Sequence, residues 1–392
     1  MNDRLPHIFF QSTNEGRRIT SIESFRVLAI LGVILWHTDL LLRIRQFAGG
    51  RWPVDVTIDL VWWVSLPYFF IVAGYFYGKS VNAHPHPLAQ FYHYSSSLIG
   101  ILVAWVCVYA VLPSNWPVAV RDNGWWQPFQ TEALKNMNLL ATQHIKLFLM
   151  GDLPVWHLWF LPALMFSLAT VALIALFRLR RLVIPLTVGL YLLALTEEFA
   201  GGHFGNFNFH LGTWSIAILF TVLGSWLAGR GKPSLATAFS VLVVGYAIAF
   251  VEWLVVKEFF HLPTYKHHYF GGIFLPLGFF LLALARPNLG RCTPLPFLAK
   301  FTMGVYVSHV FIIYTFTPVG WRLQNLFPVL SPLWPFLFPF IVYTMAVLFT
   351  LVLSQIPLVR SLVTRPRDWN RRDTSRSVSQ SGLTSELQGA AK

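Results

Sequence analysis

The chain has 392 residues, of which 55% are hydrophobic and only 11% are charged. A soluble protein of this size carries about 25% charged residues, so this composition excludes a soluble globular domain and indicates a polytopic membrane protein. The net charge of +13 does not indicate a nucleic-acid partner, because most Lys and Arg residues lie in short segments between apolar runs, where they set membrane topology.

The apolar runs predict an all-α, polytopic membrane helix bundle with about ten transmembrane helices. In chain order, the predicted spans are residues 21–45, 57–78, 91–113, 156–177, 182–199, 211–229, 234–256, 269–285, 301–318 and 334–357. An even number of spans places both termini on one side of the membrane. The enrichment of Lys and Arg on that side predicts that both termini are cytoplasmic.

Three regions follow from this topology. Residues 1–20 are polar and have no cleavable-signal pattern, which predicts a cytoplasmic N-terminal tail. Residues 21–357 form the transmembrane domain, and residues 358–392 are basic and then serine-rich, as in a disordered cytoplasmic tail. Residues 114–155 are too polar to span, and their amphipathic stretch, residues 131–149, is expected along the outer membrane surface.

Two ionisable residues in the first span define the candidate site. Arg26 and His37 are eleven positions apart, which is about three helical turns or roughly 16 Å, so both side chains point from one face. Arg26 could simply extend to the membrane surface, and His37 could be a structural histidine bonded to a carbonyl. Ionisable residues in a membrane more often face a bundle interior or a wet cavity. Their shared face therefore favours a polar shaft for an anionic substrate with a reactive end.

Other spans contribute further candidates. His157 opens the fourth span and His309 lies in the ninth, so both are expected near His37, where a neutral imidazole can accept and return a proton. Glu252, in the seventh span, is a candidate charge partner for a cavity Arg or His. No nucleophile elbow, phosphate-binding glycine loop or zinc signature occurs. Cys107 and Cys292 are expected at different levels, which predicts neither a disulfide nor a metal site.

Four segments in this order resemble the membrane acyltransferase 3 family, and most closely its O-acetyltransferase branch, typified by the enterobacterial common antigen O-acetyltransferase. The matching residues are Arg26 and His37; Pro67, Phe69, Phe70, Gly74 and Tyr75; residues 157–160 (HLWF); and Gly304, Tyr306 and His309. The resemblance extends from about residue 20 to residue 357. Ala73 stands where the family usually has Ser. The family's Arg-x-x-Arg motif after the second span is missing, and Lys79 with three histidines occupies that region.

The resemblance implies an O-acyltransferase of the bacterial inner membrane. Such enzymes move an acyl group, commonly acetyl, from cytoplasmic acetyl-CoA to a hydroxyl of a surface or periplasmic glycan, or of a lipid-linked sugar. They work within membrane lipid, and no metal and no nucleic acid is implied.

The resemblance also implies roles for residues. His37 would act as general base or carry the acyl group transiently. His309, Tyr306 or Trp159 would stabilise the oxyanion. The CoA phosphates would be held by a set of cations at the inner mouth. This set comprises Arg26, Lys79, Arg178, Arg180 and Arg181.

Two other classes of protein remain compatible with buried His and Arg residues. A transporter or flippase for a polar lipid or sugar is the main alternative, and it would neither bind acetyl-CoA nor yield an acetylated product. A sensor or scaffold with the same bundle is the third, and the polar residues inside the membrane disfavour it.

Overall fold

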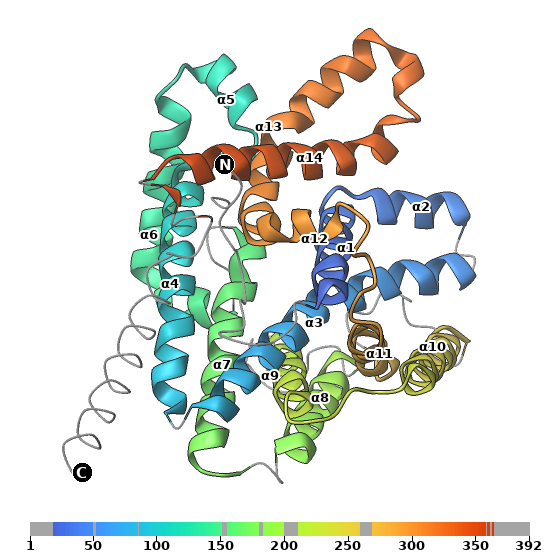
Figure 1. The fold of residues 1–392 in the computed structure, drawn as a ribbon. Coiled ribbons are helices and arrows are strands. Elements are labelled where there is room, and N and C mark those ends of the chain that lie inside the picture. The colour runs from blue at the N-terminus through green and yellow to red at the C-terminus, as the bar shows by residue number, and fades with distance from the viewer. Residues whose placement is uncertain are drawn as a thin grey trace, which may run out of the picture.

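The computed structural model describes residues 19–49, 52–84, 86–150, 155–179, 183–199, 211–258, 269–357, 359–360 and 363. These residues form helices and no strands (Figure 1). The α-helices are α1 Thr20–His37, α2 Leu40–Ala48, α3 Trp52–Ala83, α4 Pro87–Val111, α5 Trp116–Asn123, α6 Gln127–Met150, α7 Phe160–Leu176, α8 Val183–Phe199, α9 Leu211–Leu227, α10 Leu235–Glu258, α11 Gly271–Ala285, α12 Leu295–Leu298, α13 Thr302–Leu326 and α14 Trp334–Gln355. Three short 3₁₀ helices are η1 Trp156–Trp159, η2 Ala299–Phe301 and η3 Pro328–Leu330.

The structure is that of a multi-pass membrane protein. Six segments in the described part of the chain are helical, long and apolar enough to cross a bilayer: Thr20–His37, Pro87–Asn123, Trp156–Leu176, Leu235–Val255, Leu295–Leu326 and Trp334–Gln355. Two shorter apolar helices, Trp214–Leu227 and Gly271–Ala285, lie among them. The larger number of about ten spans and the sidedness of the termini stay predictions, and the two predicted tails fall almost entirely outside the described residues.

The predicted first span, residues 21–45, is wrong as one continuous helix. The chain breaks after His37, and α2 starts in a new direction at Leu40 (Figure 1). Asp39 adopts the left-handed conformation, with φ of 57°, which a right-handed helix cannot accommodate. Thr38 closes α1, because its backbone N–H and its hydroxyl both donate to the Ile34 carbonyl, at 3.0 and 2.8 Å. His37 is therefore the last residue of a helix rather than a mid-helix residue.

α3 is the central helix of the bundle and contacts α1, α7, α9 and α11. Its approach to α9 is the closest, because small residues lie in the interface. A Cβ added at Gly74 would collide with the backbone of Thr221, and one at Gly78 would lie 2.7 Å from the Cα of Ser225. On α9, a Cβ at Gly224 would in turn collide with α3. This close packing fixes the position of α3 relative to the helices that carry the site.

The predicted outer segment, residues 114–155, is helical over much of its length. The amphipathic stretch falls within α6, which runs alongside α4 (Figure 1). The Asn136 side-chain amide is buried and donates to the Ala110 carbonyl at 2.9 Å. α5 packs on α13, where the Trp116 indole N–H donates to the Thr315 hydroxyl at 3.1 Å. This segment is thus attached to the bundle by specific polar contacts.

Candidate functional site

Three histidines from distant parts of the sequence meet inside the bundle. His37 ends α1, His157 lies in η1 and His309 lies in α13. The ring centroids of His37 and His309 are 5.0 Å apart, and those of His157 and His309 are 5.1 Å apart. His309 is fully buried and His157 is 2% exposed, whereas His37 is partly exposed. His37 is therefore the most exposed member of this histidine cluster.

The tautomer of His309 follows from its hydrogen bond. Its Nδ1 lies 2.6 Å from the Tyr306 carbonyl oxygen, which can only accept, so Nδ1 carries a proton. In the neutral imidazole, Nε2 then carries the lone pair. This Nε2 is buried and has no hydrogen-bond partner within the described residues. In this tautomer, neutral His309 is an acceptor toward the cluster, and the oxyanion role that the resemblance implied for it stays a prediction.

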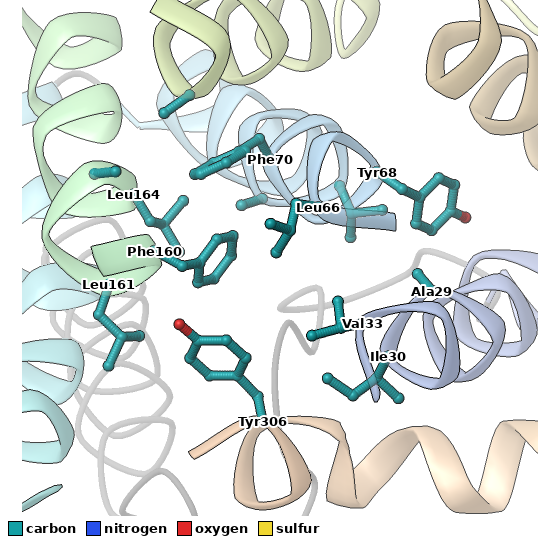
Figure 2. Close-up of a cluster of buried hydrophobic side chains, with 14 of the residues drawn as sticks. Ala29, Ile30, Val33, Leu66, Tyr68, Phe70, Phe160, Leu161, Leu164 and Tyr306 are labelled. Carbon is teal, nitrogen blue, oxygen red and sulfur yellow. The ribbon is translucent and has the colours of Figure 1, made fainter. Parts of the chain in front are cut away.

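Tyr306 connects two members of the cluster. Its hydroxyl donates to the backbone carbonyl of His157, while its own carbonyl accepts from His309 Nδ1. Because the hydroxyl is already bonded to protein, Tyr306 positions the histidines and does not present a free donor to an oxyanion. Figure 2 shows this hydroxyl directed toward Phe160 and Leu161 at the start of α7.

Two aromatic residues at the cluster were not among the sequence-based candidates. The Tyr109 ring lies 5.1 Å from His157, and its hydroxyl donates to the Val307 carbonyl at 2.8 Å and accepts from the Phe311 N–H at 3.1 Å. The Trp156 ring lies 4.5 Å from His37 and is half exposed. Tyr109 is one aromatic among many in an apolar run, so the sequence carried no signal for it. Trp156 is adjacent to His157 and could have been inferred from that motif.

Arg26 lines an apolar pocket beside the cluster. The pocket has a volume of about 460 Å³, including its open mouth, and lies between α1, α3, α7 and α13. Its lining comprises Arg26, Leu66, Phe69, Val72, Ala73, Phe160, Leu164, Thr302, Met303 and Tyr306. Arg26 is only 6% exposed and interacts electrostatically with Glu23 and Tyr68. Its guanidinium is the charged group of this lining. The Thr302 hydroxyl, which is also in the lining, already donates to the Ala299 carbonyl at 2.9 Å.

Tyr306 and Phe160 join the pocket to the histidine cluster. Both line the pocket, and their rings are 5.2 Å apart. The Tyr306 ring is 5.9 Å from His157 and 6.1 Å from His309. The close-up in Figure 2 shows Tyr306 and Phe160 facing each other across this wall, with Leu66 and Val33 beside them. An apolar compartment with a cation thus adjoins a group of neutral bases.

The remaining candidates lie elsewhere. Lys79 is exposed, with its Nζ 4.8 Å from the Tyr75 ring centroid, and Arg178 is exposed after the end of α7 with φ of 57°. Arg180 and Arg181 lie outside the described residues. The Trp159 ring lies 6.2 Å from that of Phe70, against α3.

Glu252 has a structural role rather than the predicted pairing with a cavity cation. Its two carboxylate oxygens accept the backbone N–H groups of Phe270 and Gly271, at 2.8 and 2.7 Å. It thereby caps the start of α11, where unpaired N–H groups favour a carboxylate. Sequence alone did not show this contact, because the cap comes from another helix, 19 residues away in sequence.

No metal site is formed by the described residues, since no group of three or more His, Cys, Asp or Glu side chains has a ligating arrangement. Cys107 and Cys292 are both free and exposed.

Comparison with known families shows which family the chain belongs to. The model of the acyltransferase 3 family, described as an acyltransferase domain, matches residues 19–355. No curated protein and no solved structure matches the chain. The matched region contains Arg26, the pocket and all three histidines of the cluster. The chain therefore belongs to the acyltransferase 3 family and is a membrane acyltransferase.

Proposed function

We propose that this protein is an O-acyltransferase of the bacterial inner membrane, with about ten spans and both termini in the cytoplasm. It moves an acetyl or other short acyl group from cytoplasmic acyl-CoA to a hydroxyl of a surface or periplasmic glycan, or of a lipid-linked sugar. The observation that carries the proposal is the junction at Tyr306, where the apolar pocket with Arg26 meets the histidine cluster with partly exposed His37.

The donor is proposed to approach from the cytoplasmic side. Exposed Lys79 and Arg178, with Arg180 and Arg181, hold the CoA phosphates, because cations recognise phosphate groups. The buried guanidinium of Arg26 supplies positive charge further along the path. The apolar walls of the pocket suit the hydrocarbon parts of the pantetheine arm and the acyl group, and bring the thioester toward His37.

The chemical step is a direct transfer with His37 as general base. His37 removes the proton of the acceptor hydroxyl while the hydroxyl oxygen attacks the thioester carbonyl carbon. The O–C bond forms, the C–S bond breaks, and His37 returns the proton to the CoA sulfur. The exposed edge of His37 beside Trp156 is the side on which the acceptor hydroxyl is proposed to bind. The alternative is attack by His37 itself: an N–C bond forms while the C–S bond breaks, and the acceptor oxygen then forms the O–C bond while the N–C bond of the acyl-histidine breaks.

The test is transfer of radiolabelled acetyl from acetyl-CoA into the envelope glycan fraction. Membranes would contain the wild-type protein, the His37→Ala variant, the control Lys135→Ala, or no protein; Lys135 is exposed on α6 and pairs with Glu132. We expect label with the wild type and the control, and at least a 100-fold loss with His37→Ala. Label that stays on quenched protein would identify the acyl-histidine route.

Two outcomes would contradict the proposal. Full labelling by His37→Ala at normal membrane levels would move the chemistry away from α1. Absence of label together with absence of CoA binding by the purified protein would favour a transporter instead.

A further inference from the structure

The structure assigns a specific partner to His37, and this inference rests on the proposed acyl-transfer function. His309 is fully buried, its Nδ1–H is held by the Tyr306 carbonyl, and its Nε2 lone pair has no hydrogen-bond partner within the described residues. A buried acceptor without a partner is costly and persists where it has a function or binds something that the resting structure lacks.

The groups around His309 limit what that partner can be. Three aromatic rings lie close to the His309 ring: His37 on α1, His157 in η1 and Tyr306 on α13. Their ring centroids are 5.0, 5.1 and 6.1 Å from that of His309. The Tyr306 hydroxyl is committed to the His157 carbonyl. His157 is as close to His309 as His37 is, and its two ring nitrogens are buried without a hydrogen-bond partner within the described residues. His37 differs from it in being partly exposed, so a bond from His37 is the one that would orient a base toward a substrate. At these centroid separations, facing ring nitrogens come within hydrogen-bond distance after a small ring rotation.

We propose that His309 is a positioning residue that accepts a hydrogen bond from His37 through Nε2. The bond forms when the His37 ring rotates toward His309, and it then places the proton of neutral His37 on the nitrogen that faces His309. The other nitrogen of His37 then carries its lone pair toward the acceptor hydroxyl. When that nitrogen takes the hydroxyl proton, the imidazolium still donates to His309, which shares the positive charge until the proton passes to the CoA sulfur.

Tyr306 maintains this arrangement. Its carbonyl fixes the His309 tautomer, and its hydroxyl ties the His157 backbone to α13. Tyr306 thus holds the His309 ring and the His157 backbone, and it also forms part of the pocket wall.

The proposal is tested with two variants of similar size. In His309→Asn, the amide nitrogen replaces Nδ1 and keeps the bond to Tyr306, but the acceptor at Nε2 is lost. In His309→Gln, the longer side chain brings an amide oxygen to the position of Nε2. We expect kcat to fall roughly 100-fold in His309→Asn and about 10-fold in His309→Gln, with KM for acyl-CoA unchanged within about twofold.

A spectrum of ¹⁵N-histidine-labelled wild-type protein in micelles gives a readout that needs no turnover. The signals of His309, assigned by their loss in His309→Asn, should show a protonated Nδ1 and an unprotonated Nε2. Failure of the proposed function would appear as no transfer by the wild type. If the wild type transfers the acyl group, three results would contradict the role of His309. These are a proton on Nε2 of His309, a full rate in His309→Asn, and equal losses of rate in the two variants.

Discussion

At the scale of single residues, the site combines one buried cation with three neutral bases. Arg26 was identifiable from the sequence, because a charged side chain in an apolar run is costly to bury in a membrane and usually has a functional role. Its surroundings were not, since Glu23 and Tyr68 are ordinary residues in the sequence and only folding brings Tyr68 of α3 against α1. The Glu23 carboxylate lowers the free-energy cost of burying the Arg26 guanidinium, which remains part of the pocket wall.

Removal of the Arg26 charge should weaken binding of the donor. Loss of one charge-assisted hydrogen bond costs about 1.5–3 kcal/mol, which corresponds to a rise of roughly 10- to 160-fold in KM. We expect Arg26→Gln to raise KM for acetyl-CoA by that factor, with a smaller effect on kcat, and Arg26→Lys to recover part of the loss. Steady-state CoA release by purified protein provides both constants.

Two further proteins keep the Arg26 experiment interpretable. Arg121→Gln is the matched control, since Arg121 is exposed and pairs with neighbouring Asp122, at 2.7 Å. The double variant Glu23→Gln/Arg26→Gln removes both charges, and it separates the loss of the Arg26 guanidinium from any destabilisation by the Glu23 carboxylate that Arg26→Gln leaves without its cation. An unchanged KM in a folded Arg26→Gln protein would exclude a role for the guanidinium in donor binding.

At the scale of helices, close packing of small residues positions the site. Gly74 lies in the resemblance motif, and the structure gives its physical role: α3 contacts the α9 backbone there. α3 in turn carries Leu66, Phe69, Val72 and Ala73 of the pocket wall. A shift of α3 away from α9 would therefore alter the pocket.

A matched pair of glycines tests this role. Gly74→Ala adds a methyl group that collides with the Thr221 backbone, and overpacking of this kind costs about 1–3 kcal/mol. Gly100→Ala, on α4, meets no atom within 4 Å and should be neutral or stabilise the helix by about 0.5–1 kcal/mol. Thermal unfolding in detergent should therefore give a lower midpoint for Gly74→Ala alone. Equal midpoints for the two variants would show that α3 and α9 are not in tight contact.

The sequence predicted helix positions better than helix ends. Most predicted spans agree with a helix to within a few residues, as at α9, α11 and α14, because a long apolar run in lipid must be helical. The break after His37 was missed because Leu40, Leu41 and Leu42 continue the apolar character, and one left-handed residue, Asp39, ends the helix. The tautomer of His309 and the cap by Glu252 depend on contacts between distant segments, which periodicity does not encode.

At the scale of the whole molecule, the number of spans determines which face each loop occupies. The six candidate spans among the described residues and the ten predicted spans are both even numbers, so either number would place the two termini on one side of the membrane. The difference lies in the other helices, of which α3 is the clearest. Its 32 residues extend about 48 Å at 1.5 Å per residue, more than the roughly 30 Å of a bilayer core. α11, with 15 residues, reaches only about 22 Å and needs local thinning or buried ends.

Cysteine labelling distinguishes the two topologies. In a Cys107→Ala background, the three probes are native Cys292, Gln46→Cys and Ala83→Cys, all at exposed positions. With ten spans, a membrane-impermeant maleimide should label position 46 in intact spheroplasts, and positions 83 and 292 only in inside-out vesicles. If α3 does not span, position 83 is labelled in spheroplasts together with position 46. That result would place the end of α3, and Lys79 near it, on the outer face, where they could not hold a cytoplasmic CoA.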